Sequence, residues 1–174
     1  MDGERGARPV PTLAVVGRSG VGKTTLLAGV IRALRARGLR VGVIKHSRGF
    51  SDPDRPGKDS QVLREAGAQR LALASPDATV LFERHPGSEP SFAERLALVS
   101  HGVDLVLVES YRSADLPCIE VLRQGACEEP GFARRSPCLA VAADFTPPGV
   151  DRPVLPLNDP DAVAQFITRA LGLA

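Results

Sequence analysis

The sequence predicts an α/β fold in which a largely parallel sheet lies between helices. Short runs of apolar residues alternate with amphipathic segments along the chain, and the central runs are apolar throughout. A continuous apolar run is typical of a strand buried on both faces, as in a parallel sheet covered by helices. The length of 174 residues fits one domain of ordinary size. We therefore expect a flexible tail over residues 1–11 and a single domain over residues 12–174.

The first three elements follow this pattern. Residues 13–16 form an apolar run that ends in glycine and predict a strand. Residues 23–37 predict a helix closed by Gly38, because apolar residues recur there at helical spacing and glycine commonly follows a helix. Residues 41–44 predict a second strand.

The remaining elements alternate in the same way. Residues 105–108 form the most apolar run of the chain, which predicts an interior strand, and residues 47–57 predict a mobile polar loop. Pro76-Asp77 joins two runs closely enough to predict an antiparallel pair. The further strands are expected at 71–74, 79–82, 119–122, 139–142 and 154–155, and the further helices at 59–66, 91–100 and 159–171.

Composition limits the classes of function. The formal net charge is +2, which favours neither nucleic acid nor a membrane surface as a partner. No run has the length of a membrane span. The three cysteines, Cys118, Cys127 and Cys138, form no CxxC motif, so we expect reduced thiols in a cytoplasmic protein.

Residues 17–24, GRSGVGKT, match the phosphate-binding pattern G-x4-G-K-[ST] between a predicted strand and a predicted helix. With this composition, roughly 0.003 matches are expected by chance. Glycines let backbone N–H groups face phosphate oxygens, the lysine reaches the β- and γ-phosphates, and the hydroxyl suits Mg²⁺. A strand–helix turn without a ligand is the alternative. The phosphate-binding residues predicted from this motif are Gly17, Ser19, Gly20, Val21, Gly22, Lys23 and Thr24, with Thr24 on the metal.

A carboxylate at the end of a neighbouring strand usually completes such a site. Asp104 precedes the most apolar run and Glu109 ends it. Ligands of open α/β sheets bind at the carboxyl ends of strands, which favours Glu109 as the metal residue. The alternative for Glu109 is a pairing with Arg112. Lys23 and Glu109 are the predicted catalytic residues for any hydrolysis.

Other polar residues follow predicted strands on the same edge. Lys45 and His46 end the second strand, where Lys45 can meet phosphate. Lys58 and Asp59 follow the polar loop, and Asp59 is either a metal residue or a helix N-cap. Asp144 follows a later strand, where a carboxylate can accept hydrogen bonds from guanine.

Together these residues resemble the MobB family, the adapter proteins of molybdopterin-guanine dinucleotide biosynthesis. The resemblance covers about residues 12–121, with a weaker match around Asp144. It rests on GRSGVGKTTLL from Gly17, VIKH from Val43, PGKDS from Pro56, REAGA from Arg64, and LVE from Leu107. It implies a P-loop NTPase-type three-layer fold with helices on both faces. It further implies a homodimer that binds GTP, hydrolyses it slowly at most, and associates with the guanylyltransferase MobA; molybdopterin is a further candidate ligand.

Carried over to this sequence, the resemblance implies that residues 17–25, and so also Thr25, hold phosphate and Mg²⁺. It places Lys45, His46, Lys58, Asp59 and Glu109 around them. The chain departs from the family after Glu109, where Ser110 replaces the usual glycine, and at Cys118, where lysine is common. The loop SRGFSDPD after His46 lacks the histidines that the family often has there.

Two other functions use the same phosphate-binding loop. A small-molecule kinase would transfer the γ-phosphoryl group, with Arg134 and Arg135 in a lid. A GTPase metallochaperone would need a cysteine- or histidine-rich segment, which the sequence lacks. A domain with a vestigial loop is a third alternative, and the preference for GTP over ATP stays open.

Overall fold

The computed structural model describes residues 9–47, 49, 58–111, 115–134 and 137–173. Most of the expected tail and of the polar loop 47–57, as well as Arg112 and Arg135, lie outside the described residues. The chain forms two compact units, Met1–His46 with Phe92–Ala174, and Ser47–Ser91.

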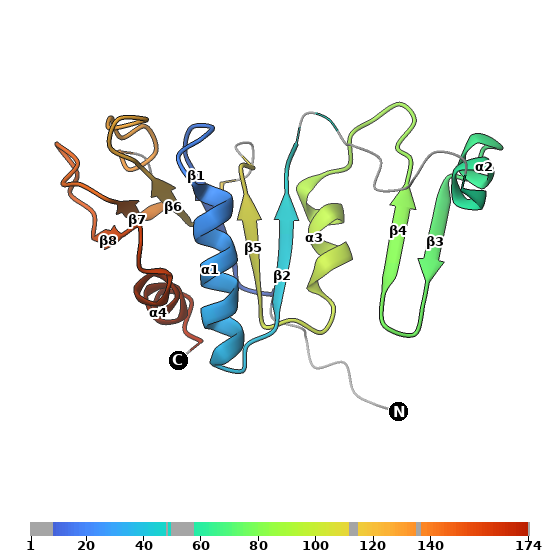
Figure 1. Ribbon diagram of the computed structural model, residues 1–174, viewed down its shortest axis with the longest axis horizontal. Helices are drawn as coiled ribbons and strands as arrows, with labels where there is room; N and C mark the ends of the chain where they lie inside the picture. The colour runs from blue at the N-terminus through green and yellow to red at the C-terminus, as the bar shows by residue number, and fades with distance from the viewer. Residues whose placement is uncertain (1–8, 48, 50–57, 112–114, 135–136, 174) are drawn as a thin grey trace. The chain divides into compact units, whose positions relative to one another are not determined.

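The first unit contains a six-stranded sheet in which every neighbouring pair is parallel (Figure 1). This confirms the predicted, mostly parallel α/β fold. The interior position predicted for the most apolar run is also confirmed, because β5 pairs on both sides and is buried along its whole length. In sheet order the strands are β2 (Val41–Lys45), β5 (Leu105–Glu109), β1 (Thr12–Val16), β6 (Cys118–Val121), β7 (Cys138–Ala143) and β8 (Val154–Pro156).

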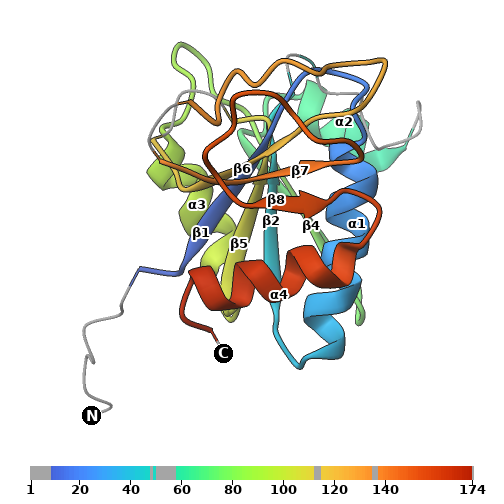
Figure 2. The same ribbon diagram turned by 90° about the vertical axis from the view of Figure 1, so that its left-hand side faces the viewer.

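Helices cover both faces of this sheet. Helix α1 (Lys23–Ala36) follows β1, and α3 (Phe92–Ser100) packs on β2 and β5 from the opposite face (Figure 2). Gly42 makes this contact close, because a Cβ atom there would lie 2.6 Å from the carbonyl oxygen of Val99. The arrangement is the predicted three-layer one.

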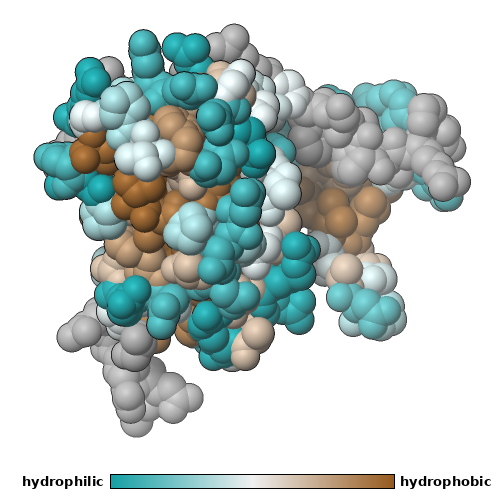
Figure 3. All heavy atoms as spheres, turned by 60° about the vertical axis from the view of Figure 1, so that its left-hand side comes forward, coloured by the Kyte–Doolittle hydropathy of each residue, from teal (hydrophilic) through white to brown (hydrophobic). Residues whose placement is uncertain are grey.

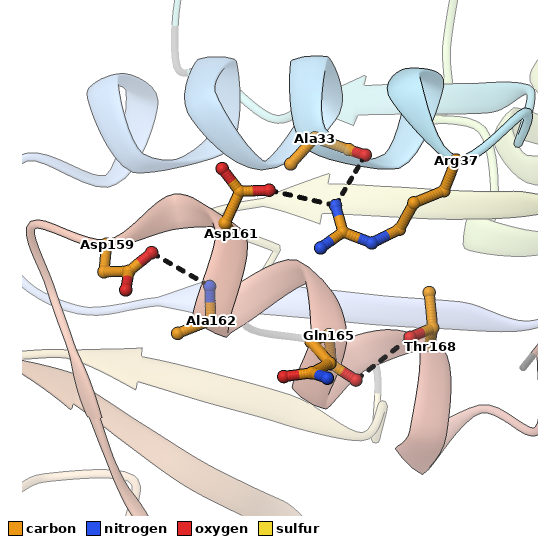
Figure 4. A network of polar contacts seen from close by, with 7 residues as sticks. All are labelled: Ala33, Arg37, Asp159, Asp161, Ala162, Gln165 and Thr168. Carbon is orange, nitrogen blue, oxygen red and sulfur yellow. Dashed lines mark hydrogen bonds and ion pairs between the residues drawn. The ribbon is translucent and has the colours of Figure 1, made fainter.

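Helix α4 (Pro160–Ala170) packs against α1. Gly29 allows the approach, since a Cβ atom at this position would lie 2.5 Å from the Cγ atom of Pro160. Arg37, the C-cap residue of α1, donates to the backbone oxygen of Ala33 and pairs with Asp161 (Figure 4). The ion pair measures 3.1 Å. The side chain of Asp159 caps α4 by accepting from the N–H of Ala162. These contacts fix the segment between β8 and α4.

The second unit holds α2 (Asp59–Glu65) and a hairpin of β3 (Arg70–Ala74) and β4 (Thr79–Glu83). The predicted antiparallel pair is confirmed, although it forms a sheet of its own. Arg70 pairs with Glu83 across the hairpin at 2.6 Å. Several apolar side chains of this unit are exposed: Val62, Leu63, Leu73, Val80 and Leu81.

The three cysteines are buried, free thiols. Cys118 and Cys138 face each other in the register of β6 and β7, and the hydrogen bond between them, with burial, raises the pKa of the Cys118 thiol. Among the described residues, no group of three or more His, Cys, Asp or Glu side chains is arranged to hold a metal ion.

The surface of the first unit mixes hydrophilic and apolar side chains. Figure 3 shows a hydrophobic patch bordered by hydrophilic residues on the face turned toward the viewer. The edge strand β8 contributes exposed apolar surface through Val154. Within the described ranges, no helix combines the length and apolarity that crossing a bilayer requires.

Candidate functional site

The loop between β1 and α1 has the backbone shape that its glycines predict. Gly17, Gly20 and Gly22 have φ angles of 140°, 82° and 95°. Residues that carry a side chain rarely adopt such positive φ angles. Gly17 is further restricted, because a Cβ atom there would lie 2.6 Å from the carbonyl oxygen of Val121 on β6. The loop thus packs directly against the neighbouring strand.

Helix α1 begins without a side-chain cap. Gly22 occupies the N-cap position in the left-handed conformation, and the first turn contains no acidic residue. The free N–H groups and the helix dipole favour an anion at this end. Ser19 in the loop and Thr25 in the first turn of α1 are exposed, whereas Val21 anchors the loop in the core.

Lys23 folds back over the loop. Its Nζ atom donates to the carbonyl oxygens of Gly17 at 3.2 Å and Arg18 at 2.7 Å. The residue is only 8% exposed. The ammonium group is thus held within the curve of the loop, where it adds positive charge to the N–H groups.

Glu109 reaches this loop from the end of β5. Its Oε1 atom accepts a hydrogen bond from the Thr24 hydroxyl at 2.8 Å, and its Oε2 atom lies 3.5 Å from Nζ of Lys45. The residue is 7% exposed. The sheet register produces the cluster, because Glu109 lies beside Val15 of β1 on one side and Lys45 of β2 on the other. Asp104 precedes the opposite end of β5 and pairs with Arg40 at 2.9 Å.

A hydroxyl beside a carboxylate suits a hard cation. Mg²⁺ prefers oxygen ligands and keeps several of its waters. Thr24 Oγ1 and Glu109 Oε1 are the right donor types, and they already lie within hydrogen-bond distance of each other. The donor set therefore fits the metal that accompanies a nucleoside triphosphate.

His46 and Ser110 support the cluster through the backbone. The N–H of His46 donates to the carbonyl oxygen of Glu109 at 3.1 Å, and its ring packs edge-on against Tyr111 at 5.0 Å. Ser110 has a φ angle of 63°. This left-handed conformation favours glycine over residues that carry a side chain. His46 thus lies directly after β2, half-buried against Tyr111.

Arg123 is a site residue that the sequence analysis missed. It follows β6, and its Nε atom donates to the carbonyl oxygen of Val21 at 3.0 Å. Its Nη1 atom lies 3.7 Å from Oδ2 of Asp144, whose Oδ1 atom accepts from the N–H of Gln124 at 2.9 Å. The rule that selected Glu109, a polar residue just beyond a buried strand, would also have selected Arg123.

The predicted site residues are divided between the two units. Lys45, His46, Glu109 and the loop 17–25 lie at the carboxyl edge of the sheet, and Asp144 follows β7 on that edge. Lys58 and Asp59 belong to the second unit, where Lys58 is the N-cap residue of α2 and Asp59 lies in its first turn. Asp59 is therefore not the N-cap that was one of its two predicted roles.

Comparison with known proteins gives consistent results. A family model described as "MobB: Molybdopterin guanine dinucleotide synthesis protein B" matches residues 12–144. The molybdopterin-guanine dinucleotide biosynthesis adapter protein of Escherichia coli (strain K12) is 38% identical over 165 residues, which cover 93% of this chain and 94% of that protein.

Solved structures agree with the sequence matches. A crystal structure of molybdopterin-guanine biosynthesis protein B superposes with a TM-score of 0.72 at 26% identity, covering 92% of this chain and 99% of that one. A more partial match is the tetraacyldisaccharide 4'-kinase of Chromobacterium violaceum, which is 32% identical over 92% of this chain but only 50% of its own length.

Proposed function

The chain belongs to the MobB family of molybdopterin guanine dinucleotide synthesis proteins, and we propose that it is the GTP-binding adapter that supports attachment of GMP to molybdopterin. It would bind GTP with Mg²⁺ at the loop 17–25 and present it in a complex with a MobA-type guanylyltransferase.

The hydrogen bond between Thr24 and Glu109 carries this proposal. It joins the phosphate-binding loop to the carboxylate that a metal–triphosphate site needs, with the two oxygens 2.8 Å apart. Mg²⁺ would supply charge neutralisation of the phosphates. In the proposed complex Lys23 contacts the β- and γ-phosphates, and Lys45, 3.5 Å from Glu109, limits repulsion between the carboxylate and the nucleotide.

An adapter role rather than rapid turnover agrees with the rest of the site. Glu109, the acidic residue that contacts Thr24, is already engaged by that hydroxyl and by Lys45. Hydrolysis requires a group that orients the attacking water. We therefore expect GTP turnover to be slow at most.

A homodimer is the proposed assembly. The hairpin β3–β4 exposes Leu73, Val80 and Leu81. A two-stranded hairpin is marginally stable alone in water, and exposed apolar strands favour burial against a partner. A second copy of the chain offers the same surface, which suits a two-fold interface.

The first test is isothermal titration of the protein with GTP and with ATP, each with Mg²⁺. We expect GTP to bind more tightly, and we expect Lys23→Ala to weaken binding of GTP by at least about 100-fold, because it removes the only buried cation among the described loop residues. Co-purification with a MobA-type enzyme tests the adapter role. Equal or tighter binding of ATP, without such association, would refute the proposal.

A small-molecule kinase is the second candidate, favoured by the match to the tetraacyldisaccharide 4'-kinase. The match covers only half of that enzyme's length, so the other half has no counterpart in this chain. Phosphate transfer from ATP to an added acceptor, measured by loss of ATP that depends on the acceptor, would support the kinase. Its absence with tight GTP binding supports the adapter.

A further inference from the structure

We infer that a hollow beside the first turn of α1 binds the purine base of the nucleotide, with Arg123 and Asn158 contacting the base and Asp144 positioning Arg123. The inference rests on the proposed nucleotide binding and assigns the part of the site that the phosphate-binding loop does not reach.

The hollow has a volume of about 160 Å³ and is lined by Gly22 and Thr25, by Arg123, and by Leu157 and Asn158. An enclosed cavity of about 150 Å³ in another protein holds a benzene ring, so this open hollow has room for one ring of a purine, with the second ring toward its open side. The lining combines apolar and polar side chains, as small-molecule sites usually do.

Its position follows from the order of the strands. The metal residues Thr24 and Glu109 mark the γ-phosphate end of a bound triphosphate, and Glu109 lies on β5, on one side of β1. The hollow lies on the other side, where residues after β6 and β8 line it. A triphosphate that crosses the loop from Glu109 brings its nucleoside to this side.

Arg123 is held in place by two partners. Its Nε atom donates to the carbonyl oxygen of Val21, and Asp144 pairs with its Nη1 atom. Both interactions leave a planar guanidinium at the wall of the hollow, and such a group stacks favourably on aromatic rings.

Asn158 lies between β8 and the N-terminus of α4. The cap at Asp159 and the contact of Pro160 with Gly29 fix this segment. Asn158 is exposed and lines the hollow, and its side-chain amide makes no hydrogen bond to any described residue. Its donor and acceptor are therefore available to the edge of a base.

Asp144 acts on the base through Arg123. Its Oδ1 atom accepts from the N–H of Gln124, its Oδ2 atom faces Arg123, and it does not line the hollow. We therefore call Asp144 a positioning residue. This replaces the role in direct guanine recognition that its place after a strand predicted.

A second hollow of about 270 Å³, lined by Arg18 and residues 125–129, is the competing location. Two of its lining residues, Glu128 and Glu129, are acidic, and it contains no residue of α1. It therefore offers less to a nucleotide whose phosphates lie at the start of that helix.

The test compares binding of GTP, ATP and inorganic tripolyphosphate, each with Mg²⁺, by titration calorimetry. Asn158→Ala should weaken the binding of GTP about ten-fold, which corresponds to the loss of one good hydrogen bond. It should leave the binding of tripolyphosphate unchanged, because tripolyphosphate lacks a base. Glu129→Gln is the matched control in the second hollow and should change neither ligand. Unchanged thermal unfolding of both variants shows that they fold.

Asp144→Asn separates the two roles of that residue. Because Asp144 acts through Arg123, the substitution should weaken the binding of GTP and of ATP by the same factor. If the substitution instead removed only the preference for GTP over ATP, Asp144 would recognise guanine directly, and its assignment as a positioning residue would be overturned. An effect of Glu129→Gln without one of Asn158→Ala would place the base in the second hollow. Failure of the unaltered protein to bind any of the three ligands would refute the proposed function itself.

Discussion

The Thr24 hydroxyl donates a hydrogen bond to Glu109 across 85 positions of sequence, over a distance of 2.8 Å. This contact links the loop after β1 to the end of the adjacent strand β5. Both oxygens are ligands that Mg²⁺ accepts, so the contact is also where the proposed metal would enter.

Glu109→Gln should weaken binding of GTP about ten-fold in the presence of Mg²⁺, because the amide is a poorer magnesium ligand. Without Mg²⁺ the same substitution should leave binding unchanged or improve it, since it removes a negative charge near the phosphates. Titration with and without EDTA measures both values. An equal loss in the two conditions would show that Glu109 does not act through the metal.

Ser110→Gly should stabilise the protein by about 0.5–1 kcal/mol, because glycine adopts a left-handed backbone conformation without steric strain. The gain is limited by the larger conformational entropy that glycine loses on folding. The residue has a φ angle of 63°. Urea unfolding measures the difference in free energy of unfolding. Ser110→Ala is the control and should give no such gain, because alanine keeps the same strain.

Gly29→Ala should destabilise the protein by about 1–3 kcal/mol, although alanine usually favours a helix. The added Cβ atom would lie 2.5 Å from Pro160. Pro160→Ala in the same chain should recover part of the loss by making room. A double-mutant cycle on the free energy of unfolding measures this coupling, and purely additive effects would show that the two helices separate instead.

Asp104→Asn should reduce stability above about pH 4 and have little effect near pH 2. Hydrogen bonds from the side chain and backbone of Arg40 lower the pKa of Asp104 from 3.8 to about 2. A carboxyl with a lowered pKa in the folded state contributes stability above its unfolded pKa and loses it as the pH falls through the folded pKa. Thermal unfolding of both proteins between pH 2 and 7 tests this, and a difference that does not change with pH would contradict it.

The sequence by itself determined the elements and the phosphate-binding loop. The apolar runs gave strands at the expected places because a parallel strand covered on both faces must be apolar throughout, as β5 is. The loop 17–24 was predictable because its chemistry depends on residues that are adjacent in the chain. Glu109 was predictable from a general rule about strand ends.

Only the tertiary structure decided which strand ends meet. The order β2-β5-β1-β6-β7-β8 brings Arg123 to Val21 and Asp144 to Arg123, and neither pairing follows from local patterns. The pairing of β3 with β4 was predictable, but not that it forms a separate sheet. Local signals report the propensity and burial of a segment, whereas these contacts depend on the order and register of strands far apart in sequence.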